Sequence, residues 1–256
     1  MITRRQIMQG LFLPALIVVV WQLLAIHIQN SFILPGWEEI VPVLISPFTP
    51  LFGGASLLEN SIISLQRVLT GFILAILIAI PLGLLCGWSK KAFAYCNPLI
   101  QIIRPVPPIA WMPLAIAWFK IGFGSLIFII LIGSFFPVLI STIDGVRTIR
   151  QSWVEVAQTL GASTREKICT VVIPGSLPSI WTGLRVAFGV AWMCVVAAEM
   201  LPGTSAGLGY LIMYAYNLGQ INVIVAGMVI IGIIGIVFDY LFRLGEISLF
   251  SWKGKE

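Results

Sequence analysis

Five ionisable residues lie inside long apolar runs of this sequence, where a charge is costly and usually functional. They are Arg67, Arg104, Arg185, Glu199 and Asp239. Arginine side chains bind anions and pair with carboxylates, so the chemistry on offer is anion binding and ion pairing. A single histidine, His27, argues against histidine-based catalysis, and the four cysteines lack metal-binding spacing. We therefore predict no catalytic residue, no metal site and no cofactor.

A polar segment of about twenty residues, from Ser152 to Pro174, separates two apolar runs. It contains S-x-x-E twice, the form of a helix capping box, at Ser152 with Glu155 and again eleven residues later at Ser163 with Glu166. The pattern predicts two short helices. Gly161 is placed to end the first, and Pro174 is expected to stop the second.

The first of these short helices is expected to have one apolar face. Its apolar residues recur at i, i+3, i+4 and i+7, the spacing of one side of a helix: Trp153, Val156, Ala157 and Leu160. That face could pack beneath the chain's own membrane domain or bind a partner. Glu155 could be a cap, a docking carboxylate, or both.

Composition sets the fold class. Of 256 residues, 59% are hydrophobic and only 10% are charged, and the mean hydropathy is +1.04. A soluble domain of this size would need far more surface charge, so we predict an all-α, polytopic membrane protein. The net charge of +5 is spread without a basic stripe, which argues against nucleic-acid binding.

A membrane-spanning helix needs about 20 mostly apolar residues, and the sequence offers six candidates. We expect them at about 11–28, 59–88, 93–119, 126–143, 177–200 and 222–241. The third must be broken, because four prolines interrupt it: Pro105, Pro107, Pro108 and Pro113. Residues 29–58 are expected to form an external loop with one short interfacial helix, and 201–221 a second, glycine-rich loop.

Lysine and arginine predict the orientation, because they concentrate in cytoplasmic loops. Only Lys120 falls on one side of the six spans, and eleven basic residues fall on the other: Arg4, Arg5, Lys90, Lys91, Arg147, Arg150, Arg165, Lys167, Arg243, Lys253 and Lys255. We therefore expect a cytoplasmic N-terminus at 1–10, a cytoplasmic tail at 246–256, and a cytoplasmic loop at 152–174.

The polar segment also resembles a known family motif. Glu155, Ala157, Gly161 and Pro174 have the spacing of the EAA loop of the inner-membrane permease subunit of ABC importers. Val156, Val171 and Ile173 replace its usual Ala, Ile and Leu, which are similar in size and polarity. Further stretches look like the nitrate, sulfonate and taurine branch of these permeases: SLQRVLTGF, RPVPPIAWMPLAIAWFKIG, GLRVAFGVAW and AAEMLPGTSAGLG.

The resemblance implies a type I ABC importer permease with its core at 59–245. It implies a homodimer, two cytoplasmic ATPase subunits that bind ATP, and an external substrate-binding protein. The loop at 152–174 would couple the membrane domain to the ATPase, through these residues: Trp153, Glu155, Val156, Ala157, Leu160, Gly161 and Pro174. No Walker A motif occurs, so ATP hydrolysis must come from the partner.

Within the membrane, Arg67 and Glu199 are expected at similar depth, and we predict that they form a structural ion pair. Arg104 lies just before the proline break, and broken helices expose backbone groups that transporters use for ligands. We therefore place a candidate translocation path at Arg104, Pro105, Pro107 and Pro108. Alternatively, Arg104 snorkels to the interface.

Two further ionisable residues lie toward the inner ends of their spans. Arg185 is near the cytoplasmic end of the fifth span, and snorkelling to the interface would explain it. Asp239 in the sixth span is four residues before Arg243, a spacing that favours pairing on one helix.

Two other classes of protein compete with the permease reading. A self-sufficient secondary transporter or channel would show an internal repeat and buried charge relays, and an intramembrane enzyme would show clustered reactive side chains. Neither pattern is clear. The sequence leaves open the substrate, the residues that line the path, and whether the dimer is homomeric or heteromeric.

Overall fold

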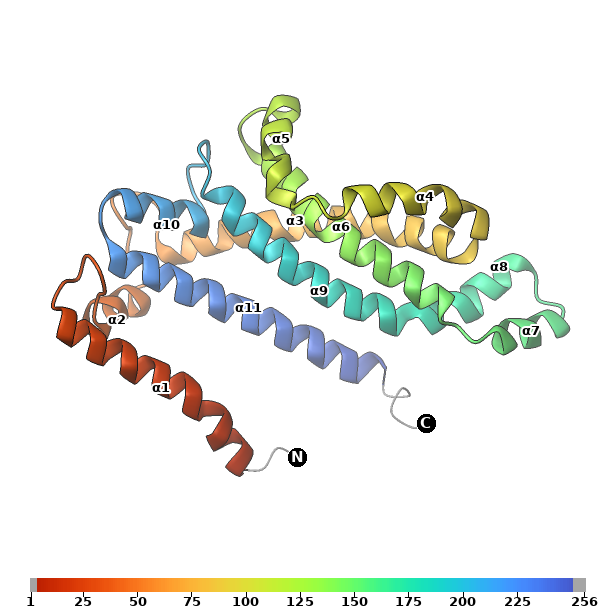
Figure 1. The fold of residues 1–256 in the computed structure, drawn as a ribbon, viewed down its shortest axis with the longest axis horizontal. Coiled ribbons are helices and arrows are strands. Elements are labelled where there is room, and N and C mark those ends of the chain that lie inside the picture. Colours follow the sequence, from red (N-terminus) through yellow and green to blue (C-terminus); the bar gives the residue numbers. More distant parts are fainter. Residues whose placement is uncertain (1–3, 251–256) are drawn as a thin grey trace.

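The computed structural model describes the backbone of residues 4–250 and the side chains of residues 12–250. Every regular element in this range is a helix, and the one β contact is an isolated bridge between Pro50 and Ser56. The long helices lie side by side in an elongated bundle (Figure 1). The all-α prediction is confirmed.

Four helices are long and apolar enough to cross a membrane. They are α3 (Leu57–Trp88), α6 (Phe123–Arg147), α9 (Ile173–Glu199) and α11 (Ile221–Leu249). They correspond to the second, fourth, fifth and sixth predicted spans. At the N-terminus of α3, Ser56 and Glu59 form a capping box, which satisfies the otherwise free backbone N–H groups of the first turn.

The third predicted span is broken, as expected. It consists of α4 (Lys90–Ile103), the short helix η1 (Pro108–Trp111) and α5 (Met112–Phe119), and its two parts meet at 89°. Proline has no N–H to donate and restricts the residue before it. The run of prolines from 105 to 108 therefore ends α4 and turns the chain.

The first predicted span lies in α1 (Arg4–Ile28), which leans away from the bundle (Figure 1). Its described apolar stretch, Phe12–Ile28, is shorter than the helices that qualify as spans. The C-terminal end of α1 is tied to α2 (Trp37–Ile45), where Gln22 both donates to Glu38 and accepts from the Trp37 N–H, each at 2.9 Å. The described residues support four spans, or five with the bent pair, so the sixth stays a prediction.

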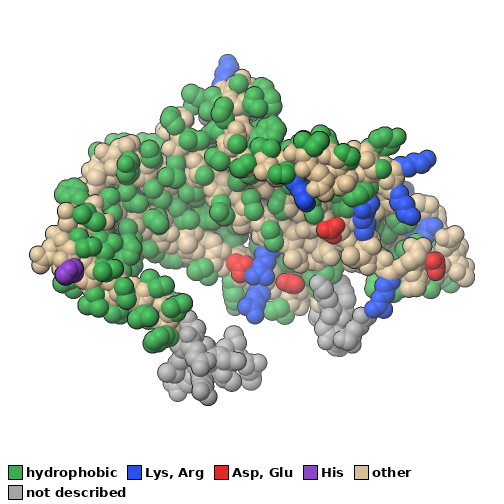
Figure 2. Space-filling model, viewed as in Figure 1, with side chains coloured by type: hydrophobic (Ala, Val, Ile, Leu, Met, Phe, Trp, Pro, Cys, Tyr) green, Lys and Arg blue, Asp and Glu red, His purple; other side chains and the backbone are tan. Residues whose placement is uncertain are grey.

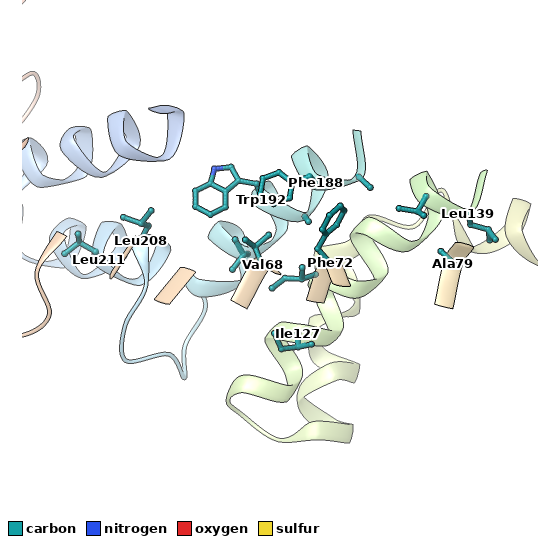
Figure 3. Close-up of a cluster of buried hydrophobic side chains, with 14 of the residues drawn as sticks. Val68, Phe72, Ala79, Ile127, Leu139, Phe188, Trp192, Leu208 and Leu211 are labelled. Atoms are coloured by element: carbon teal, nitrogen blue, oxygen red, sulfur yellow. The ribbon is translucent and has the colours of Figure 1, made fainter. Parts of the chain in front are cut away.

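The core forms where α3 and α9 pack along α6. Figure 3 shows aromatic side chains at its centre, where Phe72 of α3 meets Phe188 of α9 edge to face, with ring centroids 5.4 Å apart. Close approach of α3 and α6 depends on Gly71, Gly83 and Gly87. A Cβ at Gly83 would lie 2.6 Å from the Thr142 Cβ, closer than real side chains come.

Replacing Gly83 by alanine is therefore expected to destabilise the fold by about 1–3 kcal/mol, since α3 and α6 must separate to admit the methyl group. The measurement is unfolding of the detergent-solubilised protein. Gly232→Ala is the matched control, because no atom lies within 4 Å of the added Cβ on α11. Equal stability of the two variants would contradict this account of the α3–α6 contact.

Side-chain charge is uneven over the surface. Figure 2 shows hydrophobic side chains over most of the visible face, with Lys and Arg gathered toward the end that carries α4, α7 (Gln151–Thr159) and α8 (Thr164–Lys167). A largely apolar surface with charge at one end is what a bilayer and a polar interface require.

Candidate functional site

The polar segment forms a protrusion at one end of the bundle, built from α7 and α8 (Figure 1). The helix α7 begins at Gln151, and its N-cap, Arg150, makes no side-chain cap. The predicted capping box at Ser152 and Glu155 is therefore wrong. Because α7 starts one residue before Ser152, this serine lies within the first turn, where its hydroxyl cannot cap the N–H groups.

The other two helix-end predictions, at Ser163 and at Gly161, are confirmed. Ser163 and Glu166 form the predicted capping box: the Ser163 N–H donates to Glu166 at 2.7 Å, and the Glu166 N–H donates to the Ser163 hydroxyl at 3.3 Å. Gly161 follows α7 with φ +80°, a conformation that favours glycine. Both features agree with the sequence pattern.

Pro174 does not stop a helix, contrary to prediction. The chain is helical from Thr164 through a π-turn at Ile168–Val172, labelled η2, and on through α9 to Glu199. A proline would normally clash with the carbonyl four residues earlier. The wider π-turn directly before Pro174 removes that conflict, so one helical run joins the protrusion to the membrane helix.

The apolar face of α7 is largely uncovered. Leu160 is 82% exposed, Val156 59% and Trp153 47%, and Glu155 is also exposed. Behind Trp153 a hollow of about 370 Å³ separates α7 from Val171 and Pro174. The protrusion therefore presents three large apolar side chains that its own chain leaves open.

At the bend between α4 and η1, a pocket of about 270 Å³ opens against α6 and α9. Arg104, the C-cap residue that follows α4, is the one charged residue of the described lining, and Pro108 lies beside it. The remaining walls are apolar or glycine, with Phe136 and Val190 among them. Of the predicted path residues, Arg104 and Pro108 line this pocket, whereas Pro105 and Pro107 belong to the bend without lining it.

At the end of the bundle opposite α7, Arg67 and Glu199 form the expected ion pair, with 2.7 Å between Nη1 and Oε1. The Glu199 side chain is fully buried. It also accepts hydrogen bonds from the Ser64 hydroxyl at 2.7 Å and the Gly209 N–H at 3.1 Å. A buried carboxylate needs this many partners to offset the loss of water.

The network extends to the loop between α9 and α10 (Leu208–Asn217), which it fastens to α3. Arg67 donates to the Ala206 carbonyl, the Gly207 N–H donates to Asn60, and the Leu208 N–H donates to Ser64. Asn60 and Ser64 were not anticipated. Their spacing with Arg67, at i, i+4 and i+7, places all three on one face of α3 and could have indicated them. We call Asn60, Ser64, Arg67 and Glu199 the loop clamp.

The family follows from comparison with known proteins. Residues 79–245, more than half of the chain, match the model of the binding-protein-dependent transport system inner membrane component. The chain belongs to this family of ABC transporter permeases. A protein of Methanocaldococcus jannaschii named as an ABC transporter permease is 53% identical over 98% of this chain and 94% of its own length. Members of this family are non-catalytic, membrane-spanning subunits of transporters.

Other relatives differ in the substrates that their names give. The aliphatic sulfonates transport permease of Bacillus subtilis is 36% identical over 96% of this chain and 88% of its own. Relatives at 34–35% identity are named for taurine, bicarbonate and nitrate transport. A chain of the methionine ABC transporter MetNI has the same fold, with TM-score 0.67 at 16% identity over 75% of this permease and 95% of that chain.

The permease contains a second charge pair that differs from the sequence expectation. Asp239 of α11 does not pair with Arg243; it accepts two hydrogen bonds from Arg185 of α9, at 2.6 and 2.9 Å. Arg185 therefore has a partner on a neighbouring helix. The fork of an arginine matches both carboxylate oxygens at once, a geometry that a neighbour on the same helix offers less well.

Proposed function

We propose that this chain forms the translocation path of an ATP-driven importer for a small anion, as one of two permease copies. Two cytoplasmic ATPase subunits supply the energy, and an external binding protein delivers the substrate. Both termini and the protrusion face the cytoplasm in this arrangement. The observation that carries the proposal is the uncovered apolar face of α7, on a segment with the spacing of the EAA loop.

In this arrangement Trp153, Val156 and Leu160 enter a groove on the ATPase, with Ala157 at the edge of the same face. Large apolar side chains that are exposed in one subunit and buried in a complex contribute most of the energy of a typical interface. Glu155 lies beside this face and meets a basic group of the ATPase. Gly161 and Pro174 shape the segment that holds α7 in place.

The test is co-purification of the ATPase with Glu155→Ala and Glu155→Arg, together with ATPase activity and uptake of the purified complex. Charge reversal places two cations together and is expected to release the ATPase or uncouple hydrolysis from uptake, whereas alanine has a smaller effect. Ser163→Ala, which removes a cap on the same protrusion, is the control for local folding. Normal assembly and uptake by the Glu155→Arg complex would rule out this role.

The position of Arg104 supports a small anion as the transported substrate. It places one cation in an otherwise uncharged pocket beside the broken helix, and relatives are named for sulfonate, taurine, bicarbonate and nitrate transport. These substrates share a small oxyanion group. The guanidinium would offset the cost of taking such an anion out of water.

We expect Arg104→Gln to lower uptake at least tenfold while the ATPase still co-purifies, and Arg104→Lys to retain part of the uptake because it keeps the charge. Uptake of radiolabelled taurine, nitrate and bicarbonate into proteoliposomes with the full importer measures this. Lys120→Gln, which removes a cation at the far end of α5, is the control. Wild-type uptake by Arg104→Gln would remove Arg104 from the path.

A further inference from the structure

A larger hollow of about 650 Å³ lies between α7 and the adjoining ends of α3, α4 and α6. Its polar lining consists of three cations and two amides: Lys90, Arg147, Lys167, Gln151 and Gln158. Its apolar walls include Trp88 and the buried Val146 and Val172. We call this hollow the basic pocket.

The charge of the basic pocket is one-sided. The cations come from three separate helices, α4, α6 and α8, and none of the lining residues that the structure describes is acidic. The nearby acids, Asp144 and Glu155, lie outside the lining, and Glu166 is occupied by its capping box with Ser163. Three like charges around one hollow repel one another, so a bound anion would stabilise the arrangement.

The described cations of the basic pocket have no carboxylate partner. The Arg147 guanidinium lies over the Phe93 ring, 3.3 Å from its centroid, a contact that orients the group and leaves its N–H donors available. Lys167 is half-buried. Within the described part of the chain, none of the three cations forms an ion pair. The described lining therefore offers cationic donors without a carboxylate to neutralise them.

The position of the basic pocket indicates where such an anion comes from. The 32 residues of α3 extend about 48 Å, well beyond the roughly 30 Å of bilayer hydrocarbon. Trp88 is the last residue of α3, and Arg147 is the last residue of α6. Trp88, Lys90 and Arg147 at the ends of membrane helices are typical of the depth of the lipid head groups, where tryptophan and basic residues concentrate.

We propose that the basic pocket binds the phosphate group of an anionic phospholipid. The phosphate oxygens accept hydrogen bonds from Lys90, Arg147 and Lys167, and the glycerol lies against Trp88. Basic pockets between helices at the membrane surface bind such head groups. Because Gln151 and Gln158 belong to α7, the lipid connects the protrusion to α4 and α6. The inference goes beyond the proposed import function and does not depend on it.

The test is native mass spectrometry of the full-length permease, titrated in detergent with phosphatidylglycerol or phosphatidylcholine. We expect phosphatidylglycerol to be retained over phosphatidylcholine. Lys90→Gln and Arg147→Gln are each expected to weaken its binding about fivefold, the effect of one cation near an anionic surface. Lys91→Gln and Arg165→Gln make the same charge changes outside the pocket and are expected to have little effect. Equal losses in Lys90→Gln and Lys91→Gln would overturn the site.

Two further measurements identify the occupant. If millimolar inorganic phosphate displaces the lipid and phosphatidylglycerol binds no better than free phosphate, the lipid source is overturned and a phosphate site remains. If added ATPase subunits expel the lipid and Lys90→Gln weakens capture of those subunits, the occupant is an acidic protein surface, and the proposal is wrong. Retention of phosphatidylglycerol in the complete complex, lost in Lys90→Gln, supports it.

Discussion

Replacing Arg67 by methionine is expected to destabilise the protein by about 3–5 kcal/mol, the cost of leaving one partner of a buried ion pair uncompensated. The Glu199 carboxylate is fully buried and would keep only Ser64 and the Gly209 N–H as partners. Arg67 would also no longer hold the Ala206 carbonyl. Urea unfolding in detergent, monitored by tryptophan fluorescence, measures the loss.

Two controls separate the lost pair from a lost side chain. Arg185→Met breaks the pair with Asp239, whose side chains are 36% and 56% exposed; because the remaining carboxylate is not enclosed by protein, a smaller loss is expected than for Arg67→Met. The double variant Arg67→Met with Glu199→Gln removes both charges and keeps an acceptor, so it is expected to recover part of the stability. If Arg67→Met costs no more than Arg185→Met, the loop clamp does not stabilise the fold.

Replacing Leu160 by aspartate is expected to weaken binding of the ATPase by about 2 kcal/mol or more, roughly a thirtyfold loss of affinity. Leu160 is 82% exposed in the permease alone, so the same change is expected to leave the permease's own stability within about 0.5 kcal/mol. The effect is expected only in the complex, because there the new carboxylate would be buried in the apolar groove of the ATPase without a partner.

The measurement is binding of the purified ATPase to the immobilised permease, with unfolding of the permease alone in parallel. Thr159→Asp is the matched control, since it makes the same charge change one residue away and off the apolar face. A loss of binding with intact permease stability supports docking through α7. Unchanged binding by Leu160→Asp would place the docking surface elsewhere, and equal losses in both variants would show that charge alone is responsible.

Hydropathy and proline positions were enough to predict most of the fold. A long apolar run predicts a helix because every backbone N–H and C=O group must be hydrogen-bonded within the chain in lipid. The bend after Arg104 was also predictable, since closely spaced prolines restrict the backbone conformation and cannot continue a helix.

The errors share a cause, which is that local patterns compete with tertiary geometry. One residue of shift at the start of α7 removed the cap expected at Ser152, although the same pattern at Ser163 holds. A π-turn let the helix pass Pro174. Asp239 pairs with Arg185, 54 residues away in sequence, and not with Arg243 on its own helix.

The protein–partner contacts of the candidate site could not be read from one chain alone. The apolar face of Trp153, Val156 and Leu160 was predictable from spacing. Its exposure was not, because the same spacing also describes a helix packed on its own domain. The basic pocket was also beyond sequence reasoning, since Lys90, Arg147 and Lys167 come together only when α4, α6 and α8 meet.

The uninterrupted helical run from Thr164 to Glu199 has a mechanical consequence. Its 36 residues extend about 54 Å, with the protrusion at one end and the loop clamp at the other. A rod of this length pivoting by about 10° around its middle swings each tip by roughly 5 Å in opposite directions. If the run moves as a rigid lever, a push on the protrusion would reappear as a displacement of the loop clamp at the other end of the bundle.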